Sequence, residues 1–261
     1  KRICLITETF PLFSMGKGTS IEFLRKELTK LGYETYITGL WKKHEDFNKI
    51  PTSYIPVIAN ISKQVNKNPN YVLLSGFHVT RNAKMLAMFG FDYIHLYSEF
   101  QMSQIANELS KITGIKMPVT YHTLWKLYYD GKINKMIGNV SHCAAKQFIR
   151  SNTFKLAPVI ITQSKKSYLI FKNESRIDKD IRVIPTPMNK DIFYFNKTDE
   201  INTEILRKEH QLKNKKIIGY VNKTSIEKNT YELISYVSRL SSEIKDLVLL
   251  IVGTLQIMPS I

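Results

Sequence analysis

The stretch from Phe91 to Tyr129 decides the fold. It reads FDYIHLYSEF, then a helical interval, then MPVTYHTLWKLYY. Two short apolar strands each end in a polar segment that contains a histidine, Ile94-His95 and Tyr121-His122-Thr123, and the residues between them suffice for a helix. This order predicts a βαβ unit. Ligands of open parallel sheets bind just beyond the carboxyl ends of the strands, so polar residues at both ends predict a binding site rather than two loops.

The amino-terminal part of the chain shows the same alternation of strand and helix. An apolar strand, a glycine-containing turn, an amphipathic helix and a second strand follow one another at residues 2–8, 11–20, 21–33 and 34–40. This is how a Rossmann-like domain begins. Gly16 and Gly18 form GxG without a third glycine, which is as typical of a tight turn as of a dinucleotide site. The first N–H groups of the helix after this turn favour an anion.

The rest of the chain continues the pattern in two blocks. Before a charged stretch we expect strands at 54–58, 157–164 and 181–185, and helices within 72–91 and at 165–173. After it come a strand, a helix and a strand, at 216–222, 226–240 and 247–253. The sequence therefore predicts an α/β protein with an amino-terminal domain over residues 1–195, a linker over 196–215, and the beginning of a second Rossmann-like domain over 216–261.

Composition limits the cellular setting. With 261 residues, 43% of them hydrophobic, the chain can bury one large core or two modest ones. No apolar run reaches the roughly 18 residues of a spanning helix, and the first residues do not resemble a signal peptide. Cys4 and Cys143 have no CxxC spacing and no metal partner nearby, so we interpret both as reduced, buried thiols. We expect a soluble, cytoplasmic protein.

The positive charge is concentrated in one part of the chain. The formal net charge is +16, and residues 111–176 hold twelve Lys or Arg against only Asp130 and Glu174. Residues 132–150 have apolar residues at helical spacing, with basic residues on the other face. The basic residues that we assign to a membrane-facing surface are Lys132, Lys135, Lys146 and Arg150. Such a helix has either a solvated outer face or affinity for anionic lipid.

Several of these segments together resemble one enzyme family. A strand ending in IH, a TYHT strand with tyrosines behind it, the run Gly16, Thr19, Ser20, Ile21, and the EKN triplet at residues 227–229 resemble family 4 glycosyltransferases. The likeness is greatest to bacterial enzymes that add glucose to diacylglycerol. It implies a GT-B fold of two Rossmann-like domains, the second truncated in this chain, with the active site in the cleft between them. It also implies retaining transfer from a nucleotide sugar such as UDP-glucose, without metal or other cofactor.

The resemblance also implies roles for individual residues. His122 matches a histidine that faces the donor sugar, and we take it as the catalytic candidate. The donor diphosphate would be bound by Gly16, Lys223 and Lys228. The residues expected near the sugar or the acceptor are Gly18, Thr19, His95, Tyr121 and Thr123. Lys223 stands where the family has arginine and cannot reproduce the bidentate contact of a guanidinium.

A formal DxD motif, Asp178-Lys179-Asp180, has the spacing that metal-dependent sugar transferases use. It lies in a turn before a strand, and the resemblance is to a metal-independent class, so we do not assign a metal to it.

We therefore predict a hexosyltransferase that moves glucose to a membrane lipid such as diacylglycerol, peripheral on the inner face of the cell membrane. The alternative within the class is synthesis of surface polysaccharide or another glycoconjugate, and the fragment alone can be inactive. A basic nucleic-acid-binding protein would also fit a pI of about 9.6. Against it, the sequence has no helix-turn-helix, zinc or RNP pattern, and we expect no nucleic-acid partner.

Overall fold

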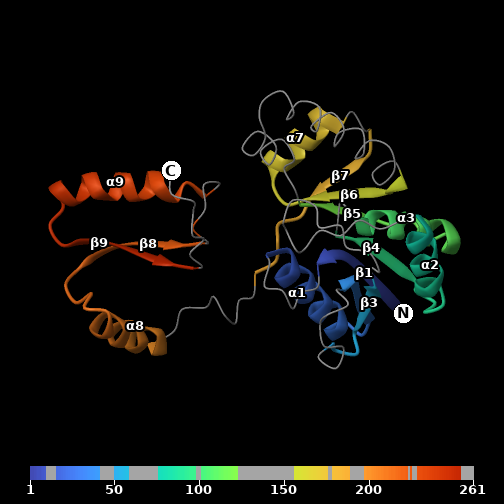
Figure 1. Cartoon of the computed structure of the whole chain (residues 1–261), viewed down its shortest axis with the longest axis horizontal. Helices are drawn as coiled ribbons and strands as arrows, with labels where there is room; N and C mark the ends of the chain where they lie inside the picture. Colours follow the sequence, from blue (N-terminus) through green and yellow to red (C-terminus); the bar gives the residue numbers. More distant parts are fainter. Residues whose placement is uncertain are drawn as a thin grey trace. The chain divides into compact units, whose positions relative to one another are not determined.

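The computed structural model describes most of the chain as two compact units, Lys1–Asn189 and Lys190–Ile261. Within them the described residues are 1–9, 16–41, 50–58, 76–97, 101–122, 156–175, 178–188, 197–222, 224 and 228–253. Figure 1 shows a sheet flanked by helices in the first unit and a small strand and helix assembly in the second. Both expected blocks of alternating strands and helices are present.

Unit 1 is built on a sheet of seven parallel strands. Their spatial order is β3-β2-β1-β4-β5-β6-β7. The strands are β1 (Arg2–Thr9), β2 (Glu34–Trp41), β3 (Tyr54–Ile58), β4 (Tyr93–Leu96), β5 (Val119–Tyr121), β6 (Val159–Thr162) and β7 (Asp180–Val183). The strand order changes direction between β1 and β4, and such a switch point is where open α/β sheets bind ligands. The expected α/β fold is confirmed.

Helices cover both faces of this sheet (Figure 1). They are α1 (Gly16–Lys30), α2 (Gly76–Ala87), α3 (Gln101–Thr113) and α7 (Lys165–Ser175). Side chains alternate between the faces along each strand, so Ile3 and Leu5 pack with α1 while Cys4 and Ile6 belong to the larger core under the other helices. Burial raises the pKa of the Cys4 thiol, as expected of an unreactive core cysteine. Cys143 lies outside the described residues.

Helix α1 begins earlier than the sequence predicted. Residues 16–20, which we expected in a turn, form its first turn. Glycine is a poor helix former, so local propensity favours a loop here. Packing outweighs it, because Gly18 and Ser20 are buried and Ile21 is fully buried beside the sheet. The GxG motif is therefore the start of a helix rather than a separate turn.

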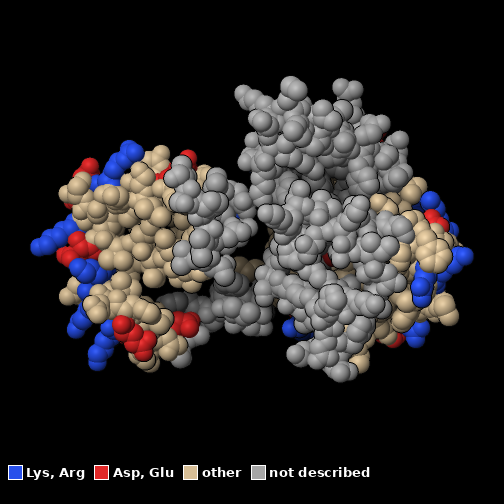
Figure 2. Space-filling view, viewed as in Figure 1, with Lys and Arg blue, Asp and Glu red and all other residues tan. Residues whose placement is uncertain are grey.

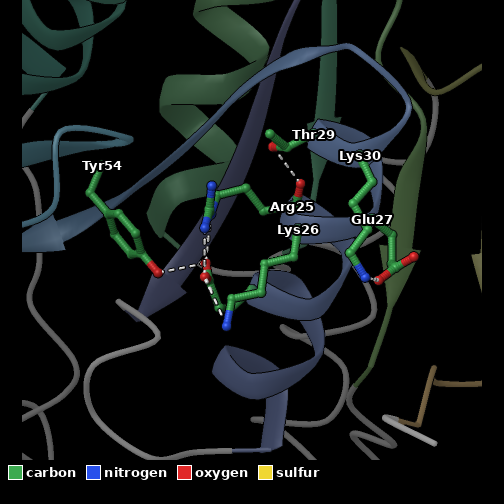
Figure 3. Close-up of polar contacts among 7 residues, drawn as sticks. Arg25, Lys26, Glu27, Thr29, Lys30 and Tyr54 are labelled. Atoms are coloured by element: carbon green, nitrogen blue, oxygen red, sulfur yellow. Dashed lines mark hydrogen bonds and ion pairs between the residues drawn. The ribbon is translucent and has the colours of Figure 1, made fainter. Parts of the chain in front are cut away.

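A polar cluster fixes α1 to the edge of the sheet. The carboxylate of Glu22 accepts two hydrogen bonds from Arg25, each 2.7 Å long, and a third of 2.7 Å from the hydroxyl of Tyr54 at the start of β3. Figure 3 shows Tyr54, Arg25 and Lys26 converging on this one carboxylate. Burial alone would raise the pKa of Glu22, but the hydrogen bonds from Arg25 and Tyr54 outweigh it and the pKa is lowered.

Unit 2 has the predicted βαβ order. Its strands β8 (Lys216–Val221) and β9 (Leu247–Val252) are parallel and joined through α9 (Thr230–Glu243). Within residues 196–215, which we expected to form a linker, Lys197–Glu209 form helix α8. Asp199 and Glu200 lie in its first turn and Arg207 and Lys208 in its last, which matches the helix dipole at both ends.

None of the described helices is long and apolar enough to cross a membrane. The predicted basic helix at 132–150, with Lys132, Lys135, Lys146 and Arg150, lies outside the described residues.

Candidate functional site

The register of unit 1 brings several polar side chains to the carboxyl edge of the sheet. Leu5 pairs with His95 across β1 and β4, and Thr120 pairs with Ile161 across β5 and β6. In a parallel sheet, paired residues point to the same face. His95, Thr120 and the residues two positions further along each strand therefore lie on the α1 face.

His122 is the first residue after β5, and Gln163 is the first residue after β6. Since Tyr121 pairs with Thr162, these two residues follow paired positions and meet at the edge. The side-chain amide nitrogen of Gln163 is hydrogen-bonded to Nδ1 of His122. An amide N–H donates and Nδ1 accepts in this arrangement, so the proton of the neutral imidazole lies on Nε2. The second ring nitrogen of His122 is thereby a donor.

His95 lies one strand away, within β4. Its Nε2 and the hydroxyl of Thr120 are 2.8 Å apart. Burial first, and then the proximity of His122, lowers the pKa of His95 to about 3, so its ring is neutral at physiological pH. A neutral ring at this position can act only through hydrogen bonds and packing.

Tyr97 links the two histidines, although no pattern in the sequence selects it. Its ring centroid is 4.6 Å from that of His95 and 5.2 Å from that of His122. Burial raises the pKa of its hydroxyl. Gln163 and Thr120 were also missed, yet both follow the rule that selected His122, since each is a polar residue at or just past the end of an apolar strand.

The switch point itself has a buried carboxylate. Glu8 near the end of β1 is 7% exposed and accepts a hydrogen bond of 3.1 Å from the backbone N–H of Met102 in the first turn of α3. A carboxylate is stabilised at a helix amino terminus. Glu8 thus connects the end of β1 to the helix that follows β4.

A cavity of about 410 Å³ lies on the α1 face of the sheet beside these polar groups. Its walls come from α1, from strands β1, β4, β5 and β6, and from the segment after β7. Its polar lining includes His95, Thr120, His122, Gln163, Ser20, Lys116 and Thr186, and the remaining walls are largely apolar.

Other expected site residues are placed as follows. Gly16, Gly18 and Thr19 lie in the first turn of α1, where Gly18 is buried and Thr19 exposed. Tyr121 differs from expectation, because its ring packs on the opposite face of the sheet, 4.9 Å from the ring of Phe171 in α7. Thr123 lies outside the described residues.

Unit 2 positions Lys228 just before α9. The hydroxyl of Tyr220 in β8 donates to the carbonyl of Lys228 at 3.0 Å and lies 3.2 Å from the hydroxyl of Thr230. Asn229 between them has a left-handed backbone with φ of 52°. The exposed Lys228 side chain thus starts from an anchored turn beyond the carboxyl end of β8. Lys223 lies outside the described residues.

The part of the chain that the structure describes holds no group of three or more His, Cys, Asp or Glu that could bind a metal ion. In the DxD motif, Asp180 forms an ion pair with Arg182, with an N–O distance of 2.8 Å.

A doubly wound parallel sheet with polar side chains at its carboxyl edge, followed by a second βαβ unit, agrees with a GT-B fold. The family model described as Glycosyltransferase Family 4 matches residues 16–191. This match covers more than half of the chain, and the chain belongs to that family.

Among curated proteins, the chain is similar to an alpha-monoglucosyldiacylglycerol synthase of Acholeplasma laidlawii. The two are 24% identical over 248 residues, which is 89% of this chain and 58% of the relative. The chain thus spans a little over half the length of that protein.

Solved structures show the same fold. HepE of Anabaena, in complex with UDP, has a TM-score of 0.64 at 13% identity over 98% of this chain and 62% of that one. The catalytic domain of starch synthase IV from Arabidopsis thaliana, bound to ADP and acarbose, has a TM-score of 0.59 at 14% identity over 96% and 68%. A glycosyltransferase from Rickettsia africae has a TM-score of 0.58 at 16% identity over 97% and 68%.

Proposed function

We propose that the whole protein transfers glucose, with retention, from UDP-glucose to a membrane lipid, with diacylglycerol as the first candidate. The observation that carries this proposal is the cluster of His122, Gln163, Tyr97 and His95 at the carboxyl edge of the sheet in a family 4 chain. The name of the Acholeplasma laidlawii relative supports the sugar and the lipid.

In this proposal His122 faces the donor sugar. Nδ1 is occupied by the amide of Gln163, so Nε2–H is the group that donates to a sugar hydroxyl. The rings of Tyr97 and His95 and the Gln163 amide hold the imidazole in one orientation. Fixed orientation of a reacting sugar supplies a large part of the rate of a transferase. His122 would act by hydrogen bonding and positioning, and no charged histidine is needed.

The donor diphosphate would interact with positively charged groups of the protein. Negative charge grows on the diphosphate as the glycosidic bond breaks, and prearranged positive groups stabilise it. We assign Lys228 and Lys223 of unit 2 to this task. The backbone N–H groups of the first turn of α1, from Gly16 to Thr19, offer a further place for an anionic group of the donor or the acceptor.

The distribution of charge supports an anionic membrane surface as the site of action. Unit 1 has 27 Lys and Arg against 13 Asp and Glu, whereas unit 2 has 11 against nine. On the face that Figure 2 shows, the described part of unit 2 presents both signs side by side. The positive excess therefore belongs to the unit that contains His122. We propose that the protein works as a peripheral protein on the cytoplasmic face of the membrane.

Synthesis of a surface polysaccharide or another glycoconjugate uses the same donor chemistry and is the alternative acceptor class. One experiment separates the two. The full-length protein is incubated with radiolabelled UDP-glucose and vesicles of diacylglycerol with anionic phospholipid, and the lipid extract is analysed for glucolipid. Labelled glucolipid with retained anomeric configuration supports the proposal. Transfer to a saccharide acceptor in the absence of vesicles, with no labelled lipid, contradicts it.

A further inference from the structure

We propose that the 410 Å³ cavity on the α1 face of unit 1 binds one acyl chain of the acceptor lipid. This inference rests on the proposed function and adds a binding site to it. The cavity is within the size range of small-molecule sites, which are about 300 to 1,000 Å³ and mostly apolar with a few polar groups that fix orientation.

Most of the cavity wall is apolar, and polar groups lie toward its ends. Side chains from α1, from the sheet and from the segment after β7 form its apolar walls: Leu24 and Leu28, Leu5 and Ile161, and Ile184 and Pro185. Leu24 and Leu28 are half-buried and pack against the core cluster that contains Leu5. The walls are thus part of the folded core of unit 1.

The cavity extends over β4 from Tyr93 to Tyr97 and over β5 from Pro118 to His122. Four residues of extended chain span roughly 13 Å. The space therefore has room for an extended part of an acyl chain.

The polar groups are distributed unevenly along this length. At the carboxyl end are His122, Gln163 and Thr120, and at the amino end are Lys116 and the Tyr93 hydroxyl, which is 3.2 Å from Lys1 Nζ. Between these ends lie His95, whose Nε2 is paired with the hydroxyl of Thr120, and apolar side chains such as Leu5, Leu24 and Ile161. A saccharide in the middle of the cavity would leave hydroxyl groups without hydrogen bonds, which is costly, whereas a hydrocarbon chain needs none. The chemistry of the walls therefore favours an acyl chain over a sugar.

The continuity of the cavity with His122 gives the acyl chain a purpose. A chain that enters from the carboxyl end leaves its glycerol hydroxyl beside the histidine that we assign to the sugar. The apolar walls replace the bilayer around that chain, so the lipid can rise from the membrane without exposing the chain to water. Chain binding and hydroxyl placement are then one event.

The first test measures binding without turnover. Full-length protein is titrated with a pyrene-labelled long-chain monoacylglycerol below its micelle concentration, and fluorescence reports binding. Leu28→Trp and Ile161→Phe each add volume to the wall, and we expect each to weaken binding about tenfold because a packed wall cannot yield. The matched control is Leu31→Trp, which makes the same exchange just after α1 at a side chain that is 73% exposed and outside the cavity. Thermal unfolding identifies any variant that has lost its fold. If one of the two cavity variants does not fold, the other, on a different element, still tests the inference.

The second test measures transfer from UDP-glucose to diacylglycerols of long and short chain length. We expect the cavity variants to lower kcat/KM for the long-chain acceptor about tenfold and to change it less than about twofold for the short-chain acceptor, since only the long chain reaches the altered wall. Equal effects on both acceptors, or binding of the pyrene probe that both cavity variants leave unchanged, would overturn the inference.

The two tests separate this inference from the proposed function. Probe binding that the cavity variants abolish, with no glucose transfer to any lipid, keeps the acyl-chain site and rejects the proposed reaction. Glucolipid synthesis by a protein that does not bind the probe keeps the reaction and rejects the site.

Discussion

The side-chain amide of Gln163 is hydrogen-bonded to Nδ1 of His122, although 40 residues separate them in sequence. The pairing of Tyr121 with Thr162 brings them together, because each is the residue that follows its strand. Gln163 thereby determines which nitrogen of His122 carries the proton.

Replacement of Gln163 should change how His122 titrates. In Gln163→Glu, a carboxylate beside Nδ1 favours the protonated ring, so the pKa of His122 rises and the acidic limb of the transfer rate moves to higher pH. In Gln163→Leu the ring loses its orientation, and we expect kcat to fall about tenfold without a shift of that limb. The pH dependence of kcat and ¹⁵N shifts of the imidazole, in the full-length protein, report both effects. An identical pH profile in Gln163→Glu would show that Gln163 does not control the ring.

Neutral His95 makes unit 1 sensitive to acid. Its pKa in the folded state is about 3, and the unfolded value is near 6.5. Below pH 6.5 the unfolded chain binds a proton that the folded chain does not. The free energy of unfolding therefore decreases as the pH is lowered, until the folded-state pKa of His95 is reached. The loss between neutral pH and pH 5 is about 2 kcal/mol. His95→Gln should reduce this loss, as measured by thermal unfolding of both proteins at pH 7 and pH 5. If both proteins lose the same stability between pH 7 and pH 5, the low pKa of His95 is contradicted.

The Glu22 cluster has the opposite pH dependence. The folded-state pKa of Glu22 is lowered, so its contribution to stability is present above the unfolded pKa of about 4.3 and is lost as pH falls through the folded pKa. Glu22→Gln should cost about 1 kcal/mol at pH 7 and progressively less as the pH falls through the folded-state pKa of Glu22, by denaturant unfolding. Glu27→Gln on the same helix, which removes the pair with Lys30, is the control and should cost less at pH 7 because that pair is more exposed. Equal losses for both variants at pH 7 would argue against a fixed α1 to β3 contact.

Lys228 offers a test of the donor site in unit 2. Lys228→Ala should lower kcat/KM for UDP-glucose about tenfold, because the side chain stabilises charge that grows on the diphosphate. The control is Lys245→Ala, an equally charged and exposed residue of unit 2 that follows α9. Steady-state kinetics with varied UDP-glucose measure both. A Lys228 variant that behaves like the Lys245 variant would remove Lys228 from the donor site.

Periodicity and strand order were sufficient to predict most of the fold. Apolar runs predicted β1, β2, β3 and β6 because buried parallel strands are nearly continuous hydrophobic segments. The first turn of α1 was not predictable, since burial of Gly18 and Ser20 overrides their low helix propensity. Helix α8 was also missed, because a charged, amide-rich sequence is as typical of a linker as of an exposed helix.

Site residues could be predicted from the sequence only where the pattern lies within one strand and its end. His122 follows an apolar strand and His95 lies near the end of another, and a local rule selects them. The contacts with their partners depend on the register between strands that are distant in sequence. No local sequence pattern shows this register. Tyr121 shows the consequence, since it neighbours His122 in sequence but its ring lies on the opposite face against Phe171.

Whether His122 acts on the donor sugar can be tested by His122→Ala in the full-length protein. Glucose transfer from UDP-glucose to diacylglycerol vesicles and the affinity for UDP are measured together, with His210→Ala, an exposed histidine of unit 2, as control. We expect that kcat for His122→Ala falls about a hundredfold while the Kd for UDP is unchanged, since the imidazole orients the sugar and does not contact the nucleotide. A His122→Ala enzyme with the turnover of the control would contradict it.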